Sequence, residues 1–529
     1  MSENQQDQSK GLPMTAKWDP EKLEREKVEL RELETKPFFI RAKAYVKRSG
    51  PGLLQSAMTL GAGSATASVV AGASFGYKLL WVQPVAMFFG VMMFAALGNI
   101  VLTTGERPYK AFMRELSIIL VFLWAFGTIF ASVIWHFPQY GLAAGSARTL
   151  VSEFGGLELE TKGDQKDWLG RTIIDEATGQ PKQGPVLNGY GKAVSFGMGL
   201  LILGVNCLVV FGYGSGSKGI KIYEWFLRTM IALVVLMFAL VFIVNIKNIQ
   251  WLEMLKGFTG YYGIPDKDPQ TVVMVMGMLG AAVGINMTFL YPYSLLAKGW
   301  GKEHKTASRW DLGLTMFLPF VLVTSLIMIG MTVSGVYEGV DGARTTMSPL
   351  DAARSLEKVL GKGPALLVFC SGLIGMCCTA ISAHMVVCGF TMCEMLGLEY
   401  TKKRFRICAL TPAIGFFGVV LNLPLWLPIV ASAICFTMLP IAYLIFLILN
   451  NKRSYIGDAV GKGLKRELFN VILVMALIFA FIGAGIQIKQ RVIDKIFPPK
   501  PAAAQPTNEP AEIQEDATPA TERATAPSS

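Results

Sequence analysis

The chain has 529 residues, of which 52% are hydrophobic and 16% are charged. Soluble domains usually carry about 25% charged residues, and here the charges collect in short clusters between long apolar runs. Several runs reach the roughly 20 residues that an apolar helix needs to cross a bilayer, which excludes an ordinary soluble domain. The net charge of +11 does not indicate nucleic-acid binding, because the basic residues stand at the ends of apolar runs, as in membrane proteins.

The polar residues 1–49 lack the apolar segment of a cleavable signal peptide and are predicted to form a cytoplasmic arm with a short surface helix. Eleven transmembrane helices are expected to follow, at 51–75, 80–103, 115–140, 193–215, 223–246, 273–297, 312–337, 364–395, 408–424, 425–448 and 467–488. Residues 489–529 are rich in Pro, Ala, Thr and Glu and are predicted to be disordered. The pattern therefore predicts an all-α polytopic membrane protein.

Basic residues in alternate short loops indicate the orientation. They cluster in residues 107–114, 298–309, 402–406 and 452–466. All four clusters lie in the cytoplasm if the N-terminus does, so we expect a multi-pass protein of the inner cell membrane with its C-terminus outside. The loop 151–192 then lies outside; we interpret it as a plain insertion, the alternative being a small extracellular cap.

Two predicted spans carry glycine and polar residues in their middle, at 60–66 and 281–288. Glycine weakens a helix by about 1 kcal/mol relative to alanine. These spans are the first and the sixth, and transporters made of inverted five-helix repeats bind their substrate where the first helix of each repeat is broken. Close helix packing through small residues is the alternative. The expected substrate-binding residues are Gly61, Gly63, Ser64, Thr66, Ala281, Gly284 and Asn286.

Several motifs resemble the NRAMP family of divalent-metal transporters. They are Gly50-Pro51-Gly52 with residues 71–82 of the first span, residues 279–283 of the sixth, Gly389-Phe390, Leu439-Pro440 and Asn451-Lys452-Arg453. The resemblance covers most of residues 50–488. It implies a LeuT-like 5+5 inverted repeat with broken helices 1 and 6, in which the repeats occupy about 50–246 and 273–448 and an extra helix occupies 467–488. It also implies transport of a divalent metal ion.

The sequence departs from the family at the residues that bind the metal. The family's first break reads Asp-Pro-Gly-Asn, whereas residues 61–64 here are Gly, Ala, Gly and Ser. In the sixth helix the family has Ala, then Met three residues later, then Pro-His. The corresponding residues are Ala281, Gly284, Ile285 and Asn286. The carboxylate, thioether and imidazole of the family's pattern are therefore replaced.

The proton-linked positions of the family also differ. The acidic pair of the third helix is absent from residues 135–139, and the glutamine positions of the eighth and tenth helices carry His384 and Ser432. A histidine inside a membrane span suggests a functional role, although a backbone hydrogen bond can also satisfy it. The candidate pathway or proton-linked residues are His384, His136, Gln139 and Ser432.

No Asp or Glu stands in the middle of any predicted span. Mn²⁺ and Fe²⁺ prefer carboxylate and imidazole ligands, and burying an uncompensated dication is very costly. Mg²⁺ keeps several of its waters. A branch of the family that carries Mg²⁺ resembles this chain in that its methionine is also replaced. We therefore expect a secondary transporter that favours hydrated Mg²⁺ over bare Mn²⁺ or Fe²⁺, with weak or absent proton coupling and no assigned metal ligand.

Two alternatives remain. The positive N-terminal ends of broken helices suit a small polar or anionic solute, and the fold can also serve a transport-inactive sensor or signalling protein. No enzyme motif is present: we find no phosphate-binding loop, no metal-ligand spacing and no nucleophile arrangement. We expect no cofactor and no nucleic acid, and as partners only the lipid bilayer and a small ion or solute.

Overall fold

The computed structural model describes residues 20–166, 171–172, 174, 179–213, 217–265, 269–339, 357–419 and 437–489. The chain divides into two compact units, Met1–Gln487 and Ile488–Ser529, and the fold is that of the first. The disorder predicted for 489–529, part of the ninth and tenth predicted spans and Ser432 fall outside the described residues, apart from residue 489.

The described chain is built from helices that follow the predicted order of spans. Spans one to five correspond to α4 (Pro51–Thr59) with α5 (Ala62–Phe75), α6 (Val82–Thr104), α8 (Ile118–Gly155), α9 (Gly189–Tyr213) and α10 (Ser217–Val244). Later spans correspond to α12 (Pro269–Ala282) with α13 (Ile285–Ala297), α15 (Leu318–Val333), α18 (Lys362–Met395), α21 (Leu439–Asn451) and α23 (Leu464–Ile488). Among the described residues, eight helices are long and apolar enough to cross a membrane. The predicted all-α membrane fold is confirmed.

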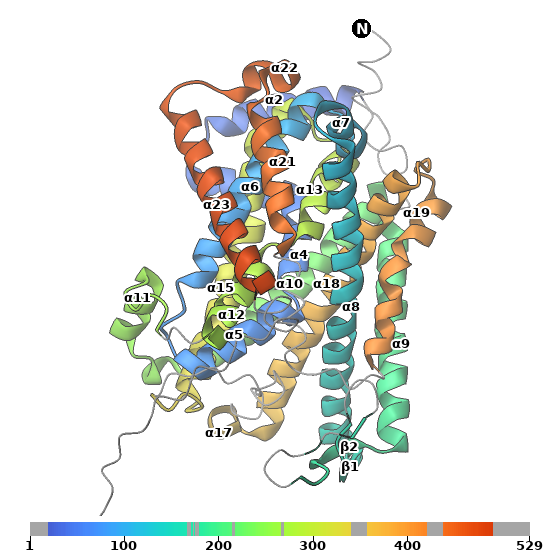
Figure 1. Ribbon diagram of the computed structural model, residues 1–529, viewed down its shortest axis with the longest axis vertical. Helices are drawn as coiled ribbons and strands as arrows, with labels where there is room; N and C mark the ends of the chain where they lie inside the picture. The colour runs from blue at the N-terminus through green and yellow to red at the C-terminus, as the bar shows by residue number, and fades with distance from the viewer. Residues whose placement is uncertain are drawn as a thin grey trace, which may run out of the picture. The chain divides into compact units, whose positions relative to one another are not determined.

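Shorter elements connect these helices. The α-helices are α2 (Pro20–Glu34), α3 (Phe38–Arg48), α7 (Pro108–Glu115), α11 (Trp251–Thr259), α14 (Lys305–Asp311), α17 (Glu357–Leu360), α19 (Lys402–Ala409) and α22 (Arg453–Ile456). The 3-10 helices are η1 (Ile246–Asn248), η2 (Lys302–His304), η4 (Thr411–Val419) and η5 (Gly457–Val460), and η3 (Leu312–Phe317) is a π-helix. Figure 1 shows α2, α7 and α22 at one end of the bundle and α17, β1 and β2 at the other.

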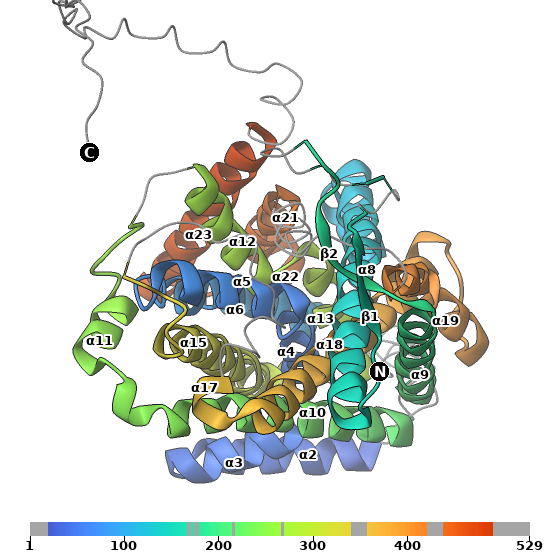
Figure 2. The ribbon, with the colours of Figure 1, turned by 90° about the horizontal axis from the view of Figure 1, so that it is seen from below.

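Both predicted helix breaks are present. α4 ends at Thr59 and α5 begins at Ala62, while α12 ends at Ala282 and α13 begins at Ile285. Gly61 and Gly284 stand directly before α5 and α13 in extended conformation, with ψ of −169° and 160°. Figure 2 shows α4 and α13 near the centre, with α10, α15 and α23 further out. In the α12–α13 pair, 94% of the membrane-spanning stretch is buried inside the protein, whereas only 28% of the stretch in α10 is buried. The breaks therefore lie in the interior.

The structure corrects two predicted boundaries. α8 continues to Gly155, beyond the expected end at 140, because Pro138 lies inside the helix without ending it. The second boundary is the start of the ninth span, expected at 408: α19 ends at Ala409 and the 3-10 helix η4 begins at Thr411, while residues 420–424 of this span lie outside the described residues.

The insertion 151–192 contains a β-hairpin. β1 (Glu160–Asp164) pairs antiparallel with β2 (Gln183–Leu187), so that Glu160 lies opposite Leu187 and Asp164 opposite Gln183. The side chain of Arg148, near the end of α8, donates to Ser195 Oγ of α9 at 3.1 Å and to Glu160 at 3.3 Å. These contacts hold the hairpin against the helix ends.

Candidate substrate site

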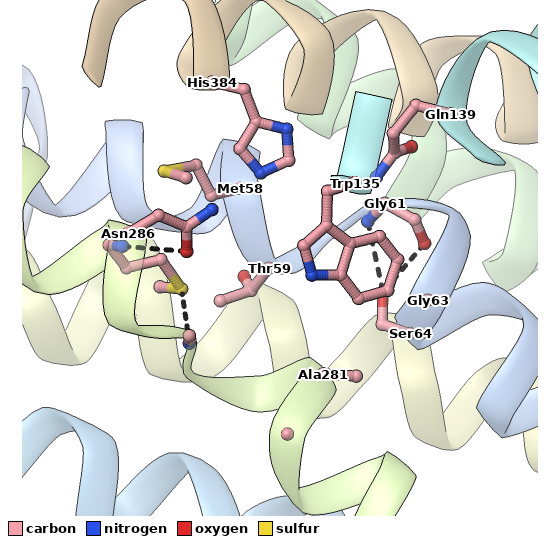
Figure 3. A pocket seen from close by; sticks show the side chains of 13 residues that line it. Met58, Thr59, Gly61, Gly63, Ser64, Trp135, Gln139, Ala281, Asn286 and His384 are labelled. Carbon is pink, nitrogen blue, oxygen red and sulfur yellow. Dashed lines mark hydrogen bonds between the residues drawn. The ribbon is translucent and has the colours of Figure 1, made fainter. Parts of the chain in front are cut away.

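A pocket with about 330 Å³ of empty space, including the part that opens outward, lies where the two broken helices meet (Figure 3). Its wall is formed by α4, α5, α8, α12, α13 and α18 and by the residues at the breaks. The residues that line it are Met58, Thr59, Gly61, Gly63, Ser64, Trp135, Gln139, Gly280, Ala281, Gly284, Asn286, Met287 and His384.

Four helix ends converge on this pocket. Met58 and Thr59 belong to the last turn of α4, and Gly280 and Ala281 to the last turn of α12. The last four carbonyl groups of a helix have no partner within it and carry a partial negative charge. The first N–H groups of α5 and α13 bring the opposite partial charge to the same place. The C-terminal ends of α4 and α12 therefore suit a cation.

The start of α5 is held by Ser64 and Gln139. The Ser64 hydroxyl accepts from the Gly61 N–H and donates to the Gly61 carbonyl, both at 3.1 Å. Gln139 Oε1 accepts from the Ala62 N–H at 2.9 Å. A Cβ at Gly61 would stand 2.5 Å from Gln139 Nε2 and 3.0 Å from Ala380 Cβ. Glycine is thus required for α8 and α18 to approach the break.

The start of α13 is held by Asn286 and Met287. Asn286 Oδ1 accepts from the Met287 N–H at 3.0 Å, and its Nδ2 donates to Ser132 Oγ of α8 at 3.4 Å. The Gly284 N–H points to Met287 Sδ at 3.4 Å. A Cβ at Gly284 would come 2.7 Å from Asn286 Oδ1. These side chains satisfy the helix start, and Asn286 Oδ1 keeps one lone pair for a ligand.

Two histidines lie side by side at the edge of the pocket. The ring centroids of His136 in α8 and His384 in α18 are 5.3 Å apart, and both side chains are buried. His136 Nδ1 lies 2.9 Å from the Ser132 carbonyl, so this nitrogen carries a proton. Among the described residues, His136 Nε2 and His384 Nδ1 have no hydrogen-bond partner. Figure 3 shows the His384 ring directed into the space between Met58 and Gln139.

Most of the residues singled out in the sequence meet at this pocket. Those that line it are Gly61, Gly63, Ser64, Ala281, Gly284, Asn286, Gln139 and His384. Thr66 does not line it: two residues beyond Ser64 on α5, it faces roughly 160° away and is buried among the helices. His136 does not line the pocket but lies beside His384, which does.

Sequence reasoning missed five lining residues: Met58, Thr59, Trp135, Gly280 and Met287. Met58 and Thr59 directly precede the first break, and Gly280 lies shortly before the second. The sequence could have indicated these three residues, because the last turn before a break must face the same space as the first turn after it. Met58 and Met287 also bring two sulfur atoms to a wall from which the family's methionine is absent.

The pocket wall is formally uncharged apart from the titratable His384. Within the described part of the chain, no three His, Cys, Asp or Glu side chains cluster in a way that would hold a metal ion. The wall offers carbonyl, hydroxyl, amide, imidazole and thioether groups. Such a set contacts a polar or hydrated ligand through hydrogen bonds but does not neutralise a bare dication.

The sequence profile of the Nramp family, described as natural resistance-associated macrophage protein-like, matches residues 189–486. No curated protein shows significant sequence similarity to the chain. The match covers more than half of the chain and includes the second break.

Solved transporter structures share the fold. A manganese transporter of Eremococcus coleocola, in complex with an aromatic bis-isothiourea substituted compound, has a TM-score of 0.59 and 14% identity; the alignment covers 88% of this chain and 90% of that one. Mhp1, a nucleobase-cation-symport-1 family transporter with bromovinylhydantoin bound, has a TM-score of 0.52 and 14% identity, with 85% and 94% covered. MhsT in complex with L-phenylalanine gives 0.53 and 13%, with 82% and 98% covered.

Proposed function

This chain belongs to the Nramp family of divalent-metal transporters, and from that premise we propose that it carries a hydrated divalent ion. Mg²⁺ is favoured over bare Mn²⁺ or Fe²⁺, and proton coupling is weak or absent. The observation that carries this proposal is the pocket at the two breaks, which is lined by helix C-terminal ends and neutral side chains without a carboxylate among the described lining residues.

Hydration resolves the conflict between a divalent ion and an uncharged wall. A bare dication in such a pocket would leave its charge uncompensated, which is very costly. An ion that keeps its waters spreads the charge, and the waters donate to acceptors such as the Asn286 amide and the carbonyls of α4 and α12. Mg²⁺ gives up its waters reluctantly and usually keeps several of them when bound.

The proposed orientation places the N-terminus and the end of the bundle with α2, α7 and α22 in the cytoplasm, and the protein in the inner cell membrane. Basic side chains support this orientation, because Arg107, Lys110, Arg114 and Lys452 all lie at that end. The β-hairpin would then face the outside.

The decisive experiment is uptake of Mg²⁺ and Mn²⁺ into liposomes that contain the purified protein, with and without a pH gradient. We expect Mg²⁺ flux, weak Mn²⁺ flux and little effect of the gradient. Gly284→Leu is the control, because its side chain would displace Asn286 from the pocket; it should abolish uptake while the protein stays folded. Proton-coupled Mn²⁺ flux would contradict the proposal, as would full uptake by the Gly284→Leu protein.

A second candidate substrate is a small polar or anionic solute. The N-terminal ends of α5 and α13 favour it, because their partial positive charge suits a carboxylate. Two structural neighbours, Mhp1 and MhsT, have bromovinylhydantoin and L-phenylalanine bound, respectively. Uptake of a labelled organic solute by liposomes that move neither Mg²⁺ nor Mn²⁺ would favour this function over ion transport.

A further inference from the structure

α3 exposes an apolar face that the described residues leave uncovered. The large exposed apolar side chains on this face are Phe39 (83% exposed), Ile40 (54%) and Val46 (42%). Lys43 and Lys47 are also exposed, and with Phe39 they form an i, i+4, i+8 row on one side of the helix. The helix contains no acidic residue. An exposed face that combines aromatic and basic residues is typical of helices that lie in a membrane interface.

The opposite face of α3 is fixed to the protein. Tyr45 is 2% exposed, and its ring stacks on Trp310 of α14 with centroids 5.5 Å apart. The guanidinium of Arg41 lies 5.5 Å from the centre of the same Trp310 ring. Because Tyr45 and Arg41 hold this face, Phe39 and Lys43 must point away from the protein.

The C-terminal end of α3 is attached to a lipid-facing helix. Arg228 of α10 donates to the Ser49 carbonyl at 2.8 Å and to the Lys47 carbonyl at 3.4 Å. Trp225, one turn from Arg228 on α10, is 68% exposed, and tryptophan concentrates where a membrane helix meets the headgroups. The uncovered face of α3 therefore lies at the depth where α10 leaves the bilayer.

We propose that α3 is an interfacial helix, which immerses Phe39 and Val46 in the adjacent leaflet and binds anionic phospholipid headgroups through Lys43 and Lys47. The occupant is a bilayer rather than a protein, because the end of α3 is attached to α10, a helix whose membrane-spanning stretch is only 28% buried, and the charge beside the apolar face is complementary to an anionic leaflet. The contact adds a membrane-facing helix to the predicted polar cytoplasmic arm, and it does not depend on which substrate is carried.

The test measures the immersion of a spin label at Val46→Cys in nanodiscs, from its collision rates with oxygen and with a water-soluble nickel chelate. Val28→Cys is the matched control, since Val28 is 54% exposed on the polar helix α2. The described native cysteines are buried or half-buried, and the unsubstituted protein gives the background. We expect the label at residue 46 to be accessible to oxygen and shielded from nickel, and the label at residue 28 to be accessible to nickel.

Lipid composition and charge variants test the headgroup contact. With about 1 kcal/mol for each lysine near an anionic surface, Lys43→Gln/Lys47→Gln should lower the ratio of immersed to exposed α3 by about 30-fold in anionic nanodiscs and leave it unchanged in zwitterionic ones. Arg25→Gln/Arg31→Gln removes the same charge from α2 and should have no such effect. Exposure of residue 46 to nickel in every lipid mixture would overturn the interfacial helix. An equal effect of the α2 and α3 double variants would overturn the specific headgroup contact.

Discussion

Asp311 Oδ2 accepts a hydrogen bond from the backbone N–H of Gly52 at 2.7 Å, and this carboxylate fixes the first turn of α4. It also lies 3.5 Å from the Gly50 N–H, while its other oxygen accepts from Thr315 at 2.7 Å. A Cβ at Gly52 would stand 2.8 Å from the Asp311 carbonyl, which explains a glycine here. The carboxylate holds the half-helix whose other end lines the pocket, so it secures the end of α4 that faces away from the substrate.

We predict that Asp311→Asn loosens α4. The amide keeps the shape of the carboxylate but loses its charge and one acceptor, at a cost of about 1–3 kcal/mol for a buried group. Ser49 is 1% exposed, so a Ser49→Cys thiol should be shielded. In the Asp311→Asn background, this thiol should react severalfold faster with a membrane-impermeant maleimide than in the unsubstituted background. Asp458→Asn removes a carboxylate that is 88% exposed and should leave the rate unchanged. Equal rates in the Asp311→Asn and unsubstituted backgrounds would show that the carboxylate does not hold the half-helix.

The helix breaks could be predicted because glycine and polar residues in a membrane span are visible in the sequence alone. The end of α8 could not, since the continuation beyond Pro138 depends on packing against α9 and η4. The sequence shows Asp311 only as an acid at the end of a predicted helix. Its hydrogen bond to Gly52 could not be predicted, because the two residues are 259 positions apart in the chain. For the same reason, the sequence marked His136 and His384 as separate candidates, whereas the fold makes them neighbours.

Gln139 provides a second prediction, which concerns the start of α5. Gln139→Ala removes the acceptor of the Ala62 N–H and leaves that buried group unpaired, so we expect a loss of about 1–3 kcal/mol in stability. Thermal unfolding in detergent is the measurement, and Gln183→Ala in the exposed hairpin is the control. Because Gln139 also lines the pocket, Mg²⁺ uptake should fall as well. An unchanged unfolding temperature would mean that water or another group replaces the amide.

His384 allows a test of the proposed weak proton coupling. His384→Gln keeps hydrogen-bonding capacity toward the pocket but does not titrate. If coupling is weak, the pH profiles of Mg²⁺ uptake by the variant and the unsubstituted protein should have the same shape between about pH 5.5 and 8. A pH dependence that is present in the unsubstituted protein and lost in the variant would instead assign proton movement to His384. His136→Gln, measured in parallel, shows whether the neighbouring ring takes part.

The last prediction concerns the ion pair between Lys298, which follows α13, and Glu224 of α10. Their charged atoms are 2.6 Å apart, and the side chains are only 21% and 11% exposed. Lys298 also donates to the Ser49 carbonyl at 2.8 Å, so it joins both helices to the junction of α3 and α4. Removing one partner of such a pair leaves a largely buried charge without its counter-charge, which typically costs 3–5 kcal/mol.

Lys298→Met should therefore destabilise the protein strongly, whereas Glu224→Gln/Lys298→Met should recover a large part of the loss, because no uncompensated carboxylate remains. Thermal unfolding of the two single variants and the double variant forms a cycle that isolates the interaction from the separate effects of each side chain. Arg228 lies 3.8 Å from Glu224 and can take over part of the pairing, so the Lys298→Met loss should grow when Arg228→Gln is added. Simple additivity of the Glu224 and Lys298 variants would show that the pair does not stabilise the α4 junction.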